Sequence, residues 1–194
     1  MLSGALVDYL SRSLDTPANS IQSRLKPLRA AQMLSKHGRG PNAGARMTSR
    51  DAVIATWANA LEIRRGANVG ATVREAFNQP EFHKYSIPDD DLMIGLKCVT
   101  ASFAGTCLEW LLDDVRSGRM AKWAKGEKVS VSAILESRGR ALTVFLSLPD
   151  GGHFRVRSIS LCYGVPKIKE PAVRKIEFHT EFFTELAKAL GPPT

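Results

Sequence analysis

Hydrophobic side chains repeat with two different periods along this chain, and the change of period limits the folds that the chain can adopt. Leu2, Leu6, Leu10 and Leu14 recur every four residues, which predicts an amphipathic helix. After residue 128, apolar and polar residues alternate instead, which is the pattern of half-buried strands. The sequence therefore predicts an α+β fold in which helices come first and an antiparallel sheet follows.

A second helix is predicted after a short turn. Thr16 suits its N-cap position and Pro17 its first helical position, because a proline there loses no intrahelical hydrogen bond. The apolar face of this helix is formed by Ile21, Leu25 and Leu28. We expect Pro27 to kink or split the helix, since proline lacks a backbone donor and crowds the preceding turn.

Two further helices are predicted before a boundary in the chain. Thr48 as N-cap and Asp51 near the helix start predict a helix over residues 49–62. A short amphipathic helix is expected around Val69, Val73 and Phe77. The stretch "NQPEFHKYSIPDDD" (78–91) is rich in turn formers, so we expect one domain over residues 1–78 and another over residues 79–194.

The second domain is predicted to contain a long helix, a three- to four-stranded antiparallel sheet and a closing helix. The long helix is expected over residues 89–116, opened by three aspartates that complement its dipole. The predicted strands are "KVSVSAILES", "ALTVFLSL" and "GGHFRVRSISLCY", with "RKIEF" as the fourth. Thr180 is expected to cap the last helix, which buries Phe182, Phe183, Leu186 and Leu190.

The net charge of +8 is concentrated near the start of the chain. Residues 1–50 hold eight basic and two acidic residues, whereas residues 51–127 hold nine basic and eleven acidic ones. Residues 128–194 add a smaller excess, with ten basic and six acidic residues. A concentrated positive charge favours a polyanionic partner, and nucleic acid is the first to consider.

The basic stretch "SKHGRGPNAGAR" (35–46) does not fit the cofactor loops that its glycines suggest. A phosphate-binding loop needs GxxxxGK[ST], but Gly44 is followed by alanine and arginine. The spacing GxGxxxG of Gly38, Gly40 and Gly44 also departs from the dinucleotide fingerprint. We therefore expect no cofactor, and the two readings that remain are a flexible linker and a loop that binds nucleic acid.

Neither a catalytic nor a metal site is predicted. The four histidines show no metal-binding spacing, and the three cysteines form no CxxC pair. The chain also lacks an apolar run of about 18 residues for a membrane span and a signal-peptide pattern. These observations predict a cytoplasmic protein with free thiols that is not an enzyme.

The segment "NSIQSRLKPLRAAQML" (19–34) resembles the recognition helix of winged helix-turn-helix DNA-binding domains, and "SKHGRGPNAGARMT" (35–48) occupies the position of the wing. The resemblance covers about residues 5–60 and is closest to regulators found in bacterial prophages and other mobile elements. It implies a sequence-specific protein that binds double-stranded DNA as a homodimer and regulates transcription. It also implies that residues 35–46 are a β-hairpin wing or an extended arm.

The resemblance assigns roles to eleven side chains. Four side chains are expected to contact DNA bases or the nearby DNA backbone: Asn19, Gln22, Ser23 and Lys26. Five basic side chains are expected to contact DNA phosphates or enter the minor groove: Arg24, Arg29, Lys36, Arg39 and Arg46. His37 and Asn42, in the segment 35–46, are also expected to contact DNA. Arg39 is the residue expected to enter the minor groove. Replacing it with alanine should weaken binding and reduce the salt dependence by up to about one unit.

Other functions remain open on the sequence. A DNA-packaging or replication-initiation component would use the same DNA-binding unit within a larger assembly. An inhibitor or adaptor would instead place the basic half of the chain on an acidic host protein. The third alternative is a hydrolase or nuclease whose site the sequence patterns do not reveal. The second domain is expected to serve self-association or partner binding, and Arg155 and Arg157 on one strand face either add phosphate contacts or are simply solvated.

Overall fold

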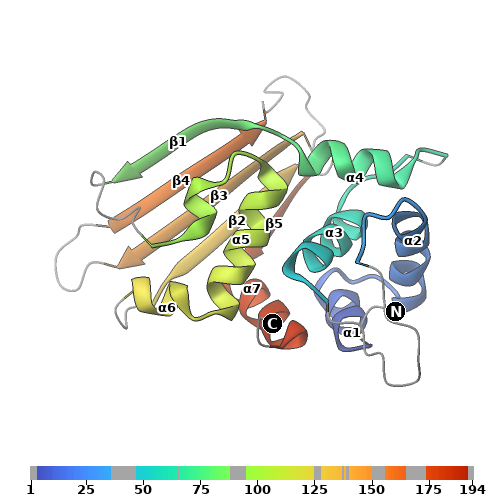
Figure 1. The fold of residues 1–194 in the computed structure, drawn as a ribbon, viewed down its shortest axis with the longest axis horizontal. Coiled ribbons are helices and arrows are strands. Elements are labelled where there is room, and N and C mark those ends of the chain that lie inside the picture. The colour runs from blue at the N-terminus through green and yellow to red at the C-terminus, as the bar shows by residue number, and fades with distance from the viewer. Residues whose placement is uncertain are drawn as a thin grey trace.

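The protein is mixed α+β, as predicted. The computed structural model describes residues 4–35, 47–64, 66–87, 95–124, 128–136, 138, 140–149, 156–164 and 174–191. Figure 1 shows the sheet on one side, with α5 and α6 lying across it, and the first four helices on the other side. The last helix, α7, lies between the two groups.

The first part of the described chain is helical. Its elements are α1 (Gly4–Ser13), α2 (Ala18–Ala30), α3 (Ser49–Ala60) and α4 (Val69–Phe77). The later elements are β1 (Glu81–Ile87), the 3-10 helix η2 (Lys97–Thr100), α5 (Ala104–Arg116), α6 (Arg119–Trp123), β2 (Ser130–Glu136), β3 (Ala141–Pro149), β4 (Val156–Gly164), β5 (Lys175–His179) and α7 (Thr180–Leu190).

The five strands form one antiparallel sheet in the order β1-β4-β3-β2-β5. Alternation along each strand divides its two faces, because successive side chains point in opposite directions. On β3, for example, Val144 and Leu146 are buried under the helices, whereas Phe145 between them is 40% exposed. The helices thus cover one face of the sheet, and small polar side chains dominate the other.

Buried residues from both predicted domains form a single hydrophobic cluster. Trp57 of α3 packs edge-on against Phe77 of α4, with ring centroids 5.5 Å apart. The Phe77 ring in turn occupies the space beside Gly105, where any Cβ on α5 would lie 2.2 Å from the ring. Tyr9 of α1 donates a hydrogen bond to the Phe182 carbonyl of α7 at 2.8 Å. The boundary predicted after residue 78 falls between α4 and β1, and its two sides share this core.

Two predicted elements differ from those of the structure. The stretch 78–91, expected to be a boundary, contains the edge strand β1, which pairs with β4 and raises the strand number to five. Pro80 and Pro88, which flank this strand in the sequence, are strong turn signals, so the sequence predicts a boundary here although apolar and polar residues alternate within the stretch. The long helix expected over 89–116 begins only at Ala104: Phe103 is extended and 46% exposed, and residues 97–100 form a 3-10 turn. The aspartates expected at its start lie outside the described residues.

The helix starts and stops agree with the sequence only in part. Thr48 and Asp51 form the predicted capping box at the start of α3. By contrast, Pro17 rather than Thr16 occupies the N-cap of α2, and His179 rather than Thr180 that of α7. Thr180 instead accepts a hydrogen bond from the Val131 amide at 2.8 Å. Helix α2 also continues through Pro27 to Ala30, so the proline does not split it. None of the described helices has the length and apolar character that crossing a membrane requires.

Candidate nucleic-acid interface

Helix α2 separates a buried apolar face from an exposed polar face. Ile21, Leu25 and Leu28 are fully buried, as predicted, and fix the helix against its neighbours. On the opposite side, four of the predicted DNA-contacting residues are exposed: Asn19, Gln22, Ser23 and Lys26. Burial of three large aliphatic side chains is worth roughly 1.5–3 kcal/mol each, so the orientation of the polar face is strongly determined.

The turn before α2 is short and hydrogen bonded. Asp15 adopts a left-handed conformation with φ of 46°, which aspartate tolerates better than most residues. The Ser11 hydroxyl donates to the Thr16 carbonyl at 2.7 Å, and the Thr16 amide donates back to the Ser11 carbonyl at 3.0 Å. The pair of reciprocal bonds fixes the direction in which α2 leaves α1.

The end of α2 is equally well defined. Gln32 is left-handed with φ of 55°, and its amide donates to the Arg29 carbonyl at 3.0 Å. The next amide, of Met33, donates to the Leu28 carbonyl at 3.0 Å. These two bonds are the Schellman pattern, which satisfies the last carbonyls of a helix and turns the chain sharply. The chain is thereby directed toward the start of α3.

One buried carboxylate holds both ends of the basic segment 36–46. Asp51 is 1% exposed and accepts a hydrogen bond from the Ser35 amide at 2.7 Å through Oδ1. Its other oxygen, Oδ2, accepts from the Thr48 amide at 3.0 Å and the Thr48 hydroxyl at 2.8 Å. The residues just before and just after the segment are therefore fixed at the same point, beside the C-terminal end of α2. Leu34 and Met47 are buried there as well.

Two predicted phosphate contacts do not lie on the exposed face of α2. Arg24 is half-buried, and its Nη1 donates to the carbonyls of Ala58 and Asn59 at 3.2 and 3.1 Å. It therefore caps the C-terminal end of α3, where helix carbonyls lack intrahelical partners. Arg29 is also half-buried, and its Nε is buried without a hydrogen-bond partner among the described residues. Neither arginine therefore belongs to the exposed face that Asn19, Gln22, Ser23 and Lys26 form.

Arg50, the last basic residue of the first fifty, is exposed but contacts α4 and α5. Its guanidinium lies 4.5 Å from the centre of the Phe77 ring and 3.4 Å from Glu109 Oε2. Partial burial raises the pKa of Glu109, and the positive charge of Arg50 opposes that rise. Arg50 thus has a carboxylate partner on α5 and a ring partner on α4.

The remaining predicted residues, Lys36, His37, Arg39, Asn42 and Arg46, lie outside the described residues. The hairpin wing or arm expected over 35–46 therefore stays a prediction, apart from Ser35 at its start. Sequence reasoning placed Asp51 at the start of α3 but missed its bond to Ser35, because no local pattern reports a contact across sixteen residues.

No metal-binding group of histidines, cysteines or carboxylates occurs in the part of the chain that the structure describes. Comparisons of this chain with protein-family models, with curated proteins and with solved structures gave no match.

Proposed function

We propose that this protein binds double-stranded DNA through the exposed face of α2 and regulates transcription in a phage or other mobile element. In this proposal α2 enters the major groove, and the basic segment 36–46 lies on the backbone or in the minor groove. The observation that carries the proposal is the exposed row of Asn19, Gln22, Ser23 and Lys26 on a helix whose other face is fully buried.

The chemistry of this face suits base edges. Amide side chains such as Asn19 and Gln22 can donate and accept at once, as the major-groove edge of adenine requires. Lys26 supplies a positive charge, and α2 contains no acidic residue that would repel phosphate. A short turn precedes the helix and a Schellman turn follows it, and the four polar side chains between them are exposed.

The charge around α2 supports the same proposal. Residues 16–50 contain seven basic residues and no acidic one. Because Asp51 holds Ser35 and Thr48, the segment that carries three of these basic residues and His37 starts and ends next to α2. A tethered basic loop beside a polar helix gives phosphate contacts that fix the register in which base contacts are made.

The test begins with selection of bound duplexes from a random pool. We expect an enriched sequence, and a palindrome would match the homodimer expected of such regulators. Binding of the selected duplex is then measured by fluorescence anisotropy at several salt concentrations. Gln22→Ala should reduce discrimination at one base position by about 1–3 kcal/mol, whereas Lys26→Ala should weaken all sequences and lower the salt slope by about one.

Lys122→Ala is the matched control, because Lys122 is also an exposed lysine and lies on α6. It should leave affinity and salt slope unchanged. The proposal fails if no duplex binds at physiological salt, or if Lys26→Ala and Lys122→Ala weaken binding equally. A ring of many subunits in solution would instead favour a packaging component.

A further inference from the structure

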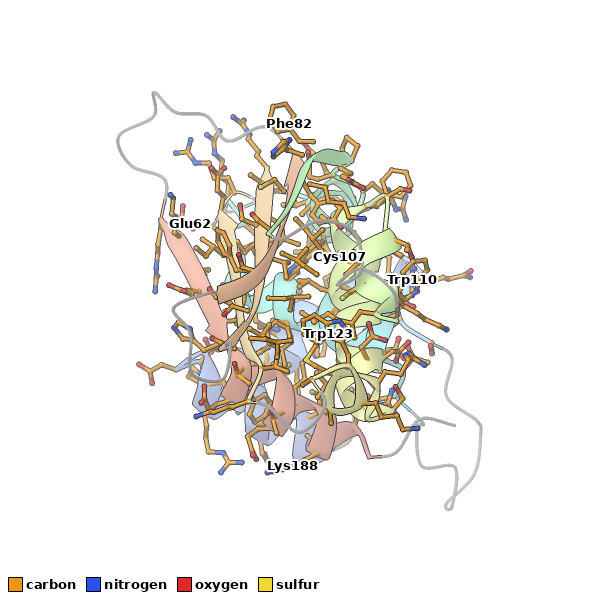
Figure 2. The ribbon with its side chains drawn as sticks, turned by 90° about the vertical axis from the view of Figure 1, so that its left-hand side faces the viewer. Glu62, Phe82, Cys107, Trp110, Trp123 and Lys188 are labelled. Atoms are coloured by element: carbon orange, nitrogen blue, oxygen red, sulfur yellow. The ribbon has the colours of Figure 1, made fainter. Side chains whose placement is uncertain are left out.

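A second basic feature, distinct from the exposed face of α2, is an open cleft of about 810 Å³. It lies between the turn that joins α1 to α2, the end of α3 with the residues after it, and the β2–β3 and β5 end of the sheet. Figure 2 shows Glu62, one of its lining residues, beside the edge strand β5. We call this feature the arginine cleft after Arg24, Arg64, Arg138 and Arg174, which line it.

The arginine cleft is positively charged. Its four arginines face two acidic lining residues, Asp15 and Glu62, which leaves a net charge of +2. Arg64 and Arg174 are exposed, and neither has an ion-pair partner among the described residues. These residues come from segments more than 100 positions apart, so the fold brings the charges together and no local sequence pattern does.

Arg24 gives the cleft a fixed donor. Its Nη1 is engaged by the carbonyls at the end of α3, which holds the planar guanidinium in place. A guanidinium has five N–H donors, so the Nε and Nη2 groups remain for another acceptor. A donor whose orientation is already fixed loses less entropy when it binds an anion.

Asn59 adds a buried acceptor that lacks a hydrogen-bond partner among the described residues. Its side chain lines the cleft and is 8% exposed, and Nδ2 donates to the Ala55 carbonyl at 2.8 Å. The bond to Ala55 fixes which end of the amide is the oxygen, and Oδ1 has no hydrogen-bond partner in the described chain. An unsatisfied buried acceptor costs roughly 1–3 kcal/mol, which a donor on a ligand or an ordered water would recover.

We infer that the arginine cleft binds a small phosphorylated molecule of about the size of a nucleotide. Its volume lies within the range of small-molecule sites, about 300–1,000 Å³. Arginine forks match phosphate oxygens in pairs, and a site with several arginines from different elements suits more than one phosphate group. Asn59 would accept from a hydroxyl or amino group of the same molecule. This site does not depend on DNA binding by α2.

The experiment is isothermal titration calorimetry with ATP and, separately, inorganic tripolyphosphate at about 0.15 M salt, where exposed charges are screened beyond about 8 Å. We expect saturable one-to-one binding of ATP. The double variant Arg64→Ala/Arg174→Ala should weaken it at least tenfold, and Asn59→Ala should reduce the advantage of ATP over tripolyphosphate. Arg74→Ala is the control, because Arg74 is an exposed arginine on α4 that does not line the cleft.

Thermal unfolding of each variant confirms that it is folded, and Arg64 and Arg174 are exposed enough for their removal to be tolerated. The inference is overturned if neither probe binds the wild type, or if the double variant binds as tightly as Arg74→Ala. It is also overturned if only duplex DNA binds and the double variant weakens that binding, because the cleft would then belong to a nucleic-acid surface. No DNA is present in the first two titrations, so failure of one proposal is not failure of the other.

Discussion

Removing the Asp51 carboxylate should destabilise the protein by about 3 kcal/mol. The carboxylate accepts three hydrogen bonds, from the Ser35 amide, the Thr48 amide and the Thr48 hydroxyl, at 2.7, 3.0 and 2.8 Å. A hydrogen bond to a charged group contributes about 1.5–3 kcal/mol, and loss of a helix cap costs roughly 0.5–2 kcal/mol. Ser35 and Thr48 are exposed, so water recovers part of the loss after Asp51→Ala, and the sum stays near 3 kcal/mol.

Thermal unfolding followed by circular dichroism measures this effect. For a chain of this size, 3 kcal/mol corresponds to a fall in Tm of roughly 6–12 °C. Asp51→Asn should cost about half as much. The amide oxygen of asparagine still accepts a hydrogen bond, whereas its NH2 group is a donor and would face the N–H or O–H donors that the carboxylate now binds. Asp8→Ala is the control: Asp8 is an exposed carboxylate on α1, and its removal should change stability by less than about 0.5 kcal/mol.

Amide hydrogen exchange tests whether the loss is local to the ends of segment 36–46. In Asp51→Ala, the exchange rates of the Ser35 and Thr48 amides should rise at least ten times more than the rates of the β3 amides. A tenfold change in rate corresponds to a loss of about 1.4 kcal/mol in the free energy of local opening. If Asp51→Ala matched Asp8→Ala in Tm, or if Ser35 exchanged as in the wild type, the carboxylate would not hold the segment and the reasoning would be refuted.

Three further predictions concern the core. Gly105→Ala should destabilise the protein by about 1–3 kcal/mol in urea unfolding, because the new Cβ meets the Phe77 ring at 2.2 Å. Gly70→Ala is the control: its nearest contact is at 3.3 Å, so its effect should stay within about 1 kcal/mol. Equal effects of the two substitutions would refute the packing argument. Burial raises the pKa of the Cys98 thiol, and raises that of Cys107 to about 12, so both should resist iodoacetamide at pH 8 until the chain is unfolded; rapid native labelling would contradict this. Because the folded state keeps the Cys107 proton that an unfolded thiol loses near pH 8.5, the free energy of unfolding should fall as the pH rises from about 8.5 toward 12.

The sequence predicted the elements that have a clear hydrophobic period. The buried stripe of α2, the capping box of α3 and the strands β2 to β5 were all read from local patterns and are confirmed. These features depend on residues within about one or two turns of one another, so a single sequence contains the whole signal. Figure 2 shows Cys107 between α5 and the sheet, and Trp110, three residues later, is half-buried and packs against the same core.

Features that depend on contacts between distant segments were not predicted. Strand β1 forms because β4 offers it a partner, and the long apolar run before α5 is broken where Phe103 pairs with Pro80. Gly105 is likewise unremarkable in the sequence, although its missing side chain admits the Phe77 ring. In each case the deciding partner lies at least twenty residues away, where periodicity and propensity give no information.

The arginines show why a charge count alone overstates what is available to a polyanion. Arg24 is used to cap α3, Arg50 lies over an aromatic ring, and Arg119 pairs at 2.6 Å with Asp114, which is fully buried. Each uses at least part of its guanidinium on a partner that the sequence could not name. Among the described residues, exposed basic side chains that form no ion pair include Lys26 on α2 and Arg64 and Arg174 in the arginine cleft. The two proposals assign anions to different surfaces, so binding assays need variants of each surface to tell them apart.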